Sequence, residues 1–451
     1  MSEAVSVSED SKSTENRMLR SRLGSILHLL SGNMAVAVLM AASTAIAARA
    51  LGPESYGVLA LILTTGRIFE RLIRFESWQP IIRFGTQPEI EGEPRALSQL
   101  FLLGLLLDIA CALLAAALML GVGYLILPTL GLDRSYFYLL AIFAPAIAFN
   151  IRGMPTAALR MAGKFKVLAY FQIFSAALRI LLAVTAWQLD ASIGVFLAIW
   201  VAAQLIDTML FAALAARALK DLGVGNPLKS KVRGLLGQFP GFMRFAWSTN
   251  ASSALRTATQ EADTLLVGAL AGPSMAGFYH LSKRFAKVAQ QIGQQVQTVI
   301  YPDLARMWAR GQFDSVKSVK TKTQLSLAAI GIVMIAIVAV IGERGVGWLF
   351  GKEYVAVFPL LVAQLVAVGL IMVAAPSRST MLAMNRPGTV LVIAAISTVA
   401  FFVAGFALIP ALGPLGANFA HILFGLVTVI LLETCFWAAR LSGDFRQAAA
   451  S

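Results

Sequence analysis

The chain contains a long stretch, residues 387–432, without a single Asp, Glu, Lys or Arg. A helix needs about 20 mostly apolar residues to cross a bilayer, so this stretch is long enough for two crossings. Similar apolar stretches recur along the sequence, and only 13% of its residues are charged, against about 25% in soluble domains. The sequence therefore predicts an all-α polytopic membrane protein.

Apolar segments of spanning length predict twelve transmembrane helices. The last two lie within the uncharged stretch and are divided near Pro410 and Pro414. The predicted spans are residues 26–48, 56–79, 99–125, 136–157, 167–189, 191–216, 242–270, 277–301, 323–341 and 354–376, followed by the two spans within 387–432.

Most Lys and Arg residues lie between these spans, on one side of the predicted topology. The longest basic loop is residues 217–239. Cytoplasmic loops carry an excess of Lys and Arg, so we expect both termini in the cytoplasm. The expected organisation is a disordered N-terminus (1–22), a six-helix lobe (23–216), the basic linker (217–239), a second six-helix lobe (240–440) and a cytoplasmic tail (441–451).

The two halves of the chain repeat each other. The Gly-Pro pair at residues 52–53 matches the pair at 272–273, a shift of 272 − 52 = 220. Gly131 matches Gly351 at the same shift, 351 − 131 = 220. Six spans per half is an even number, so the halves are expected to be parallel repeats related by an axis along the membrane normal. Such repeats occur in transporters that bind substrate between the halves and alternate access by rocking.

Arg67, Arg71 and Arg74 lie at spacings of four and three in the second span, which places them in one stripe on a helix. Charged groups inside a membrane usually face a protein-lined or hydrated cavity. We interpret the stripe as lining a pathway for an anionic group. Two alternatives remain open: the segment is a juxtamembrane cytoplasmic one, or Glu70 and Glu76 neutralise the arginines as ion pairs.

A second polar stripe occupies the matching place in the eighth span. The shift of 220 equates Arg67 with Lys287 (287 − 67 = 220), and this span is rich in Lys, Arg and Gln. Arg and Lys suit a pyrophosphate, and Gln suits sugar hydroxyls in a hydrated cavity. Glu261 and Asp263 are candidate ion-coupling carboxylates. The predicted substrate-binding residues are Arg67, Arg71, Arg74, Arg256, Lys283, Arg284, Lys287, Gln291 and Gln294.

Four charged residues stand alone inside predicted spans, and we expect them to pair with neighbouring helices rather than to bind a ligand. They are Asp108, Arg179, Asp207 and Glu433.

Several segments resemble bacterial polysaccharide-biosynthesis membrane proteins. They are residues 51–61 (LGPESYGVLAL), 75–80 (FESWQP), 276–279 (AGFY), 301–302 (YP) and 349–354 (LFGKEY). From about residue 22 to 440 the chain is similar to lipid-linked oligosaccharide flippases of the O-antigen (Wzx) type. These belong to the multidrug/oligosaccharidyl-lipid/polysaccharide flippase superfamily.

The resemblance implies two six-helix lobes that form a V around a central cavity in the bacterial cytoplasmic membrane. It implies a flippase that moves a polyprenyl-pyrophosphate-linked oligosaccharide by alternating access, for O-antigen, capsule or exopolysaccharide synthesis. In the related lipid II flippases, arginines on cavity-lining helices engage the pyrophosphate, and the stripe of Arg67, Arg71 and Arg74 matches that role. The first span lacks arginine between Leu23 and Ala48. This departure favours the oligosaccharide branch over the peptidoglycan branch.

The expected partners are the lipid-linked cargo, membrane lipids, H⁺ or Na⁺ as a coupling ion, and polymerase or assembly proteins. The alternative is a small-molecule or multidrug antiporter of the same superfamily, which the basic stripe disfavours because cationic drugs need acidic cavities. No catalytic nucleophile, metal cluster or phosphate-binding Gly loop is evident in the sequence, so we expect neither an enzyme nor a cofactor. The net charge of +14 comes largely from the loops and does not call for nucleic acid.

Overall fold

The computed structural model describes the backbone of residues 2–75, 77–231 and 234–441. Within these ranges, side chains are described except at residues 2–33, 165, 169, 236, 248–260, 298–299 and 440–441. The described chain is built from helices joined by short turns and contains no β-strand.

The helices follow one another along the chain as α1 (Ser2–Ile73), α2 (Trp78–Ile90), α3 (Pro94–Ile126), α4 (Phe137–Ala148), α5 (Gly153–Met161), α6 (Phe165–Gln188), α7 (Ile193–Asp221), α8 (Leu235–Gln238), α9 (Phe242–Ala271), α10 (Pro273–Ala309), α11 (Phe313–Phe350), α12 (Val357–Ala383), α13 (Pro387–Leu412) and α14 (Pro414–Leu441). Four short 3₁₀ turns accompany them: η1 (Leu127–Leu130), η2 (Arg134–Tyr136), η3 (Pro227–Lys229) and η4 (Lys352–Tyr354).

Nine segments of the described chain are long and apolar enough to cross a membrane. One of them, residues 34–90, contains the second of the predicted spans and most of the first. α9 and α10 have the length and the place of the seventh and eighth spans, but they are more polar and are not among the nine. The all-α polytopic fold is confirmed, whereas the number of twelve crossings stays a prediction.

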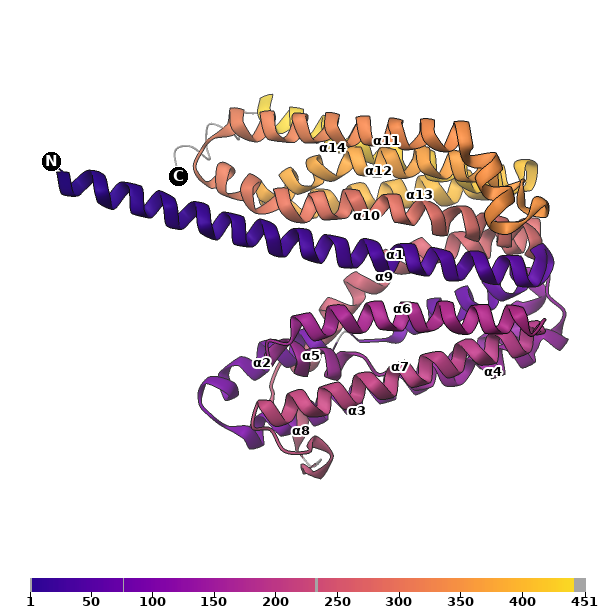
Figure 1. Ribbon diagram of the computed structural model, residues 1–451, viewed down its shortest axis with the longest axis horizontal. Coiled ribbons are helices and arrows are strands. Elements are labelled where there is room, and N and C mark those ends of the chain that lie inside the picture. Colours follow the sequence, from indigo (N-terminus) through magenta and orange to yellow (C-terminus); the bar gives the residue numbers. More distant parts are fainter. Residues whose placement is uncertain (1, 76, 232–233, 442–451) are drawn as a thin grey trace.

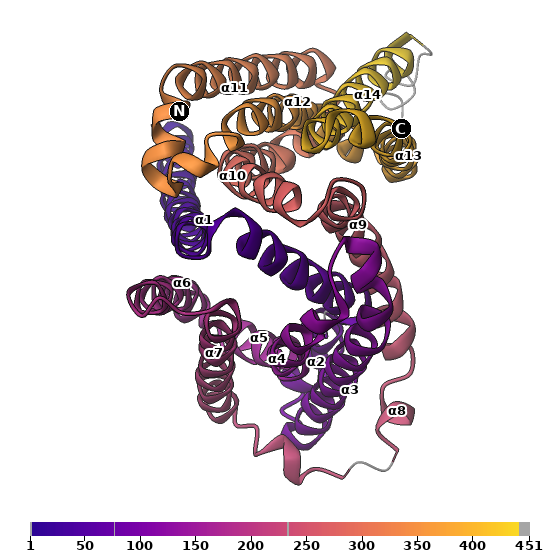
Figure 2. The same ribbon diagram turned by 90° about the vertical axis from the view of Figure 1, so that its right-hand side faces the viewer.

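The helices form two lobes (Figure 1). The part of α1 that follows Gly52 makes the N lobe together with α2–α8, and α10–α14 make the C lobe. The part of α1 before Gly52 lies between the lobes, and α1 as a whole contacts α3 and α6 of the N lobe and α10 of the C lobe. α9 leads from the N lobe into the C lobe (Figure 2). The two lobes converge at one end of the molecule and spread apart toward the end where α1 begins (Figure 1).

The first helix begins earlier than the sequence suggests. α1 is helical from Ser2, whereas the Ser- and acid-rich composition predicts disorder up to residue 22. Residues 2–23 contain neither Gly nor Pro. Extending a helix that already exists avoids the cost of nucleation, so a polar segment free of helix breakers can continue the first span. The predicted tail, 441–451, lies outside the described residues except for Leu441.

The sequence repeat is visible in the backbone of two turns. Gly52 (φ 72°, ψ 169°) interrupts α1, and Gly272 (φ 87°, ψ 171°) separates α9 from α10. These φ values are readily adopted only by glycine, and the proline that follows each turn starts the next helix with its φ already fixed. Two turns that match in sequence and in dihedral angles support the predicted repeat.

These two turns also hold the lobes together at one end, which we call the closed end. A methyl group on Gly57 would collide with the Pro273 carbonyl, and one on Gly277 would lie 2.9 Å from the Gly57 Cα atom. Gly57 and Gly277 are themselves repeat-related, since 277 − 57 = 220. The largest cluster of buried apolar residues includes side chains of both lobes around this contact, such as Leu59 and Leu281. The closed end is therefore a close-packed contact between equivalent parts of the two halves.

The two lobes differ where the N lobe interrupts its helices. α1 ends at Ile73 and α2 begins at Trp78, and α4 ends at Ala148 before α5 begins at Gly153. Their repeat counterparts, α10 and α12, run without a break through the corresponding places. Asp108 of α3 stabilises the second break, because its Oδ2 atom accepts a hydrogen bond of 2.7 Å from the first-turn backbone N–H of Met154.

Candidate functional site

A cavity of about 690 Å³ lies inside the N lobe and reaches the C lobe through one residue of α10. Its lining includes seven arginines and one carboxylate, Glu70, among the described residues. The arginines come from α1, the two helix breaks, α5, α6 and α10. They are Arg67, Arg71, Arg74, Arg152, Arg160, Arg179 and Arg284.

Some of these positive charges have carboxylate partners. Arg74 donates to Glu70 at 2.9 Å, and Arg152 is bonded to the buried carboxylate of Asp207. Glu70 also accepts a 2.6 Å hydrogen bond from the side-chain amide of Asn150. The ion-pair alternative is thus confirmed for Glu70, while Glu76 lies outside the described residues. Arg67 also lies near a carboxylate, with its Nε atom 3.7 Å from Glu261 Oε2. Carboxylates thus offset three of the seven positive charges, and the lining stays net cationic.

The wall formed by α6 and α7 combines amides, aromatic rings and cations. Arg179 donates to the Oε1 atom of Gln204, and the buried indole N–H of Trp200 has no described partner. The rings of Phe171 and Phe211 are stacked 5.0 Å apart, with the Arg152 guanidinium 5.0 Å from the centre of Phe211. Such a surface offers hydrogen-bond donors together with flat apolar faces.

A second, smaller pocket of about 330 Å³ lies between the first half of α1 and α10. Its lining is mostly apolar, apart from Arg284, Lys287 and Gln291. Met40 and Arg284 line both pockets. The first half of α1 therefore lies between two spaces that share one arginine.

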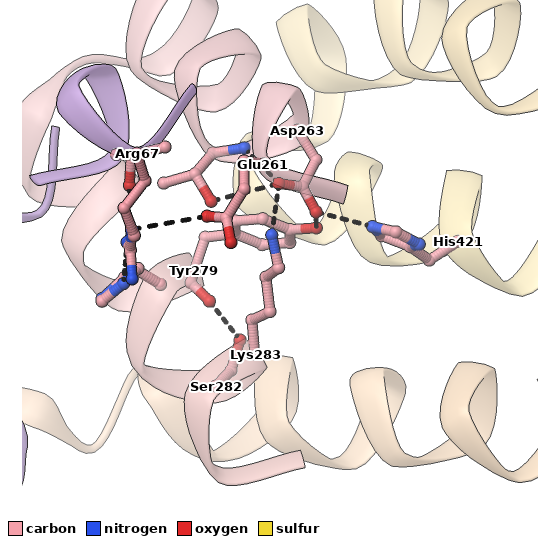
Figure 3. Close-up of polar contacts among 10 residues, drawn as sticks. Arg67, Glu261, Asp263, Tyr279, Ser282, Lys283 and His421 are labelled. Atoms are coloured by element: carbon pink, nitrogen blue, oxygen red, sulfur yellow. Dashed lines mark hydrogen bonds and ion pairs between the residues drawn. The ribbon is translucent and has the colours of Figure 1, made fainter. Parts of the chain in front are cut away.

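The C lobe holds a separate polar cluster around Asp263, whose side chain is fully buried. Lys283 donates to its Oδ1 atom at 2.6 Å, and the Tyr279 hydroxyl donates to its Oδ2 atom at 2.9 Å. His421 Nε2 lies 2.8 Å from the same Oδ2 atom. Figure 3 shows Asp263 between Lys283 and His421, with Glu261 on the side of Arg67. Each oxygen of this buried carboxylate thus has partners within the lobe.

Arg67 reaches from the cavity into the contact between the lobes. Its Nε atom lies 3.7 Å from Glu261 Oε2 of α9, and its Nη2 atom lies 3.1 Å from His280 Nε2 of α10. The same Nη2 atom donates to Thr64 Oγ1 at 3.1 Å. Arg67 therefore belongs to both the cationic cavity and the junction of the lobes.

The structure brings some of the predicted binding residues together and separates others. Arg67, Arg71, Arg74 and Arg284 line the main cavity. Lys287 and Gln291 line the second pocket, and Gln294 is exposed on α10. Lys283 is not among the residues lining either pocket, because its ammonium group binds Asp263. The side chain of Arg256 lies outside the described residues.

Two of the lone charges form ion pairs: Asp207 with Arg152, and Glu433 with Lys320 at 2.6 Å. Asp108 and Arg179 also bond to neighbouring helices, α5 and α7, but Arg179 lines the cavity as well. Arg152 and Arg160 were not among the predicted binding residues, although both line the cavity. A signal for Arg152 exists in the sequence, because Asn150, Arg152, Gly153 and Pro155 interrupt the fourth span with polar residues and helix breakers.

The arrangement of the main cavity suits a multiply charged anion. A guanidinium group presents several N–H donors in a fixed plane and pairs bidentately with phosphate oxygens. Glu70 is already paired with Arg74, so the site offers little to a cationic ligand. The described residues contain no group of three or more His, Cys, Asp or Glu side chains that could hold a metal ion.

Several known proteins are similar to this chain, and three of them are described in turn. The inner membrane protein YghQ of Escherichia coli (strain K12) is 26% identical over 333 residues, which cover 73% of this chain and 93% of that protein. The lipid II flippase MurJ, in an inward closed conformation, matches with a TM-score of 0.70 at 13% identity, covering 94% of this chain and 90% of MurJ. An inward-facing multidrug resistance transporter of the MATE family, from the MOP superfamily, matches with a TM-score of 0.72 at 13% identity, covering 91% and 96%.

At such low identity these two structures establish the fold alone, which this chain shares with both multi-pass membrane proteins. The family follows from the sequence, because residues 46–359 match the polysaccharide biosynthesis protein family. This match covers more than half of the chain, and the chain belongs to the polysaccharide biosynthesis protein family.

Proposed function

We propose that this protein is a flippase for a polyprenyl-pyrophosphate-linked oligosaccharide and that it serves cell-surface polysaccharide synthesis in the bacterial cytoplasmic membrane. The observation that carries the proposal is the cavity of about 690 Å³ lined by seven arginines. Membership of a polysaccharide biosynthesis family supports the class of cargo, and the likeness to MurJ supports a lipid-linked one. O-antigen, capsule and exopolysaccharide precursors all fit this description.

The arginines would bind the pyrophosphate of the cargo. Arg71 is exposed to the cavity, and Arg284 approaches the same space from the C lobe. Two cations from opposite lobes can hold one pyrophosphate only while both lobes contact it. Charge-assisted hydrogen bonds of this kind contribute about 1.5 to 3 kcal/mol each.

The sugars would occupy the part of the cavity next to α6 and α7. Gln204 and the free indole N–H of Trp200 provide hydrogen bonds, and Phe171 provides a flat apolar face. Sugars need this combination, because their hydroxyls lie around the ring edge while their C–H groups form apolar patches. The polyprenyl chain would remain in the membrane.

Transport would proceed by alternating access. The lobes meet at the Gly57–Gly277 contact and spread apart at the other end. If both termini are cytoplasmic, the closed end lies on the outer side and the cavity opens to the cytoplasm, where lipid-linked precursors are made. The cargo would then leave after the lobes rock to open the closed end.

Replacement of Arg71 by alanine tests this proposal. In a bacterial strain whose own flippase is missing, Arg71→Ala should lower export of the lipid-linked glycan by about tenfold to a hundredfold, the loss expected for one charge-assisted contact. The measured quantity is the amount of lipid-linked glycan that accumulates on the cytoplasmic leaflet, normalised to the level of each variant in the membrane.

Arg95→Ala is the matched control, because Arg95 is an exposed arginine near the start of α3 and does not line the cavity. It should export like the parent. Equal export by Arg71→Ala, Arg284→Ala and Arg95→Ala would rule out the cavity as the pyrophosphate site. Failure of the parent itself to restore export with any polyprenyl-pyrophosphate glycan would reject the proposed cargo.

A further inference from the structure

A buried histidine joins the two lobes near the closed end. His280 of α10 is 7% exposed, and its Nδ1 atom lies 2.7 Å from the hydroxyl of Tyr56 in α1. Its Nε2 atom lies 3.1 Å from Nη2 of Arg67, which is also in α1. One imidazole ring therefore has both nitrogens engaged by the opposite side of the junction.

The chemistry of these partners determines where the ring protons are. A guanidinium group is always protonated and can only donate hydrogen bonds. Nε2 of His280 must therefore accept from Arg67 through its lone pair, and the ring proton must lie on Nδ1, which donates to the Tyr56 oxygen. Thr64 accepts from the same Nη2 atom of Arg67, so both N–H groups of that Nη2 atom have acceptors. The contact requires a neutral imidazole of one tautomer.

A protonated His280 cannot keep this contact. The imidazolium ion has an N–H at both nitrogens, so the Nε2 proton would face a donor of the guanidinium, and the two groups would carry like charges about 3 Å apart. The other charged groups that face His280 are Lys283 and Arg284 on its own helix and Asp263 of α9. Asp263 is already bonded to Lys283 and His421, and Glu261 faces Arg67. Protonation would therefore add a positive charge where cations predominate.

We propose that His280 is a proton-binding group whose protonation breaks its contact with Arg67 and favours separation of the lobes at the closed end. In the arrangement described here the ring is neutral and the closed end is shut. When the lobes separate, the ring loses Arg67 and meets water, where an imidazole binds a proton near neutral pH. The proton and the Arg67 guanidinium thus compete for one lone pair on Nε2.

This competition would couple pH to conformation, and it would also free Arg67 to bind the cargo. Arg67 is one of the arginines lining the cavity, so its release from His280 leaves it available to the pyrophosphate. A proton taken up from the outer side would be expelled when the lobes close again and Arg67 returns to Nε2. The inference rests on the proposed alternating access but not on the identity of the cargo.

Spin labels on the two lobes test the proposal without any cargo. Arg134 in η2 and Leu412 at the end of α13 are exposed and lie on different lobes. Each is replaced by cysteine and spin-labelled, after Cys111→Ala and Cys435→Ala have removed the native thiols. Distances are measured by double electron–electron resonance in nanodiscs at pH 8 and pH 5. In the parent, acid should lengthen the distance, and the ratio of open to closed forms should rise by up to about tenfold per pH unit for one proton.

Two variants assign the proton. His280→Gln keeps an acceptor for Arg67 and a donor for Tyr56 but cannot be protonated, so it should stay closed at both pH values. His421→Gln is the matched control, because His421 binds Asp263 within the C lobe. It should respond to acid like the parent.

The proposal is overturned by a parent distance that is the same at pH 8 and pH 5, or by an acid response that persists in His280→Gln. Loss of the response in His421→Gln alone would assign the proton to the Asp263 cluster and also overturn it. Arg71, which tests the cargo, is not among the residues that bond to His280. Failure of the export experiment can therefore be told apart from failure of this one.

Discussion

Arg67 shows how one side chain can serve two purposes. It lines the cavity, and it also contacts His280 and Glu261 across the junction of the lobes. The spacing of Arg67, Arg71 and Arg74 predicts a stripe on one face, which explains why all three line one cavity. The contact between Arg67 and His280 could not be predicted, because it depends on how closely the two lobes approach.

Substitution of Arg67 should therefore be more harmful than substitution of Arg71. Arg67→Ala removes a candidate pyrophosphate contact and leaves Glu261 and His280 without their partner. We expect a loss of export larger than the tenfold to hundredfold expected for one charge-assisted contact. Arg67→Lys should be milder but not silent, because a single ammonium group cannot reproduce the planar fork. The leaflet assay measures both, and an Arg67→Ala variant that exports as well as Arg71→Ala would contradict this dual role.

Asp263 and Lys283 form an ion pair inside the C lobe that should contribute to stability. Their contact is 2.6 Å, with Asp263 fully buried. Removing one partner of a buried pair costs about 3 to 5 kcal/mol, because the other charge is left without compensation. Asp263→Asn should therefore lower the thermal unfolding midpoint in detergent, and Asp263→Asn combined with Lys283→Met should recover part of the loss.

Asp303→Asn provides the control for this stability measurement. Asp303 pairs with Arg306 at 2.8 Å, but both side chains are more than half exposed, and exposed pairs contribute about 0 to 1 kcal/mol. An Asp263→Asn midpoint no lower than that of Asp303→Asn would show that the buried pair is not needed for stability. Retained stability together with lost transport would instead support the ion-coupling role predicted for Asp263 from the sequence.

At the scale of helices, the N lobe builds its cavity from interrupted elements. Arg74 and Arg152 both lie in breaks, after α1 and before α5. The C lobe keeps α10 and α12 continuous, and its polar residues around Asp263 bond to one another instead. The two repeat-related halves thus differ, because the N lobe lines most of the cationic cavity and the polar residues around Asp263 in the C lobe bond to one another.

The second break depends on a glycine. A methyl group on Gly153 would collide with the Ser77 hydroxyl and lie 2.6 Å from Asp108 Oδ1. Overpacking of this kind costs about 1 to 3 kcal/mol. Gly153→Ala should lower the thermal unfolding midpoint. Gly121→Ala is the matched control, because nothing lies within 4 Å of the added methyl group and alanine favours a helix. Equal midpoints for the two variants would show that the break tolerates a side chain.

The sequence predicts the helices better than it predicts the site. Apolar length predicts most spans, and the Gly-Pro repeats at residues 52–53 and 272–273 predict the two halves that meet at the closed end. Hydropathy does not predict the helix breaks. Asn150 and Arg152 lie within an otherwise apolar segment, which hydropathy predicts to be a single span. Lys283 was assigned to the cavity because helical periodicity gives a direction around the axis but not the nearest partner, which is Asp263.

At the scale of the molecule, the charge pattern predicts how the protein is oriented in the membrane. The basic segment 217–239 and the start of α11, which begins at Phe313, should face the cytoplasm. The turn between α13 and α14 has no Lys or Arg and should face outward. Three single cysteines distinguish the two sides: Lys229→Cys, Ser318→Cys and Leu412→Cys. All three positions are exposed.

Labelling of intact cells with a membrane-impermeant thiol reagent checks this orientation, after Cys111→Ala and Cys435→Ala remove the native thiols. Leu412→Cys should react in intact cells, and Lys229→Cys and Ser318→Cys should react only after the cells are broken. The cavity and the closed end lie at different depths in the membrane. The labelling result therefore also shows to which side of the membrane the cavity opens. The opposite labelling pattern would place the closed end in the cytoplasm, and the cavity would then open to the side from which a lipid-linked precursor could not enter.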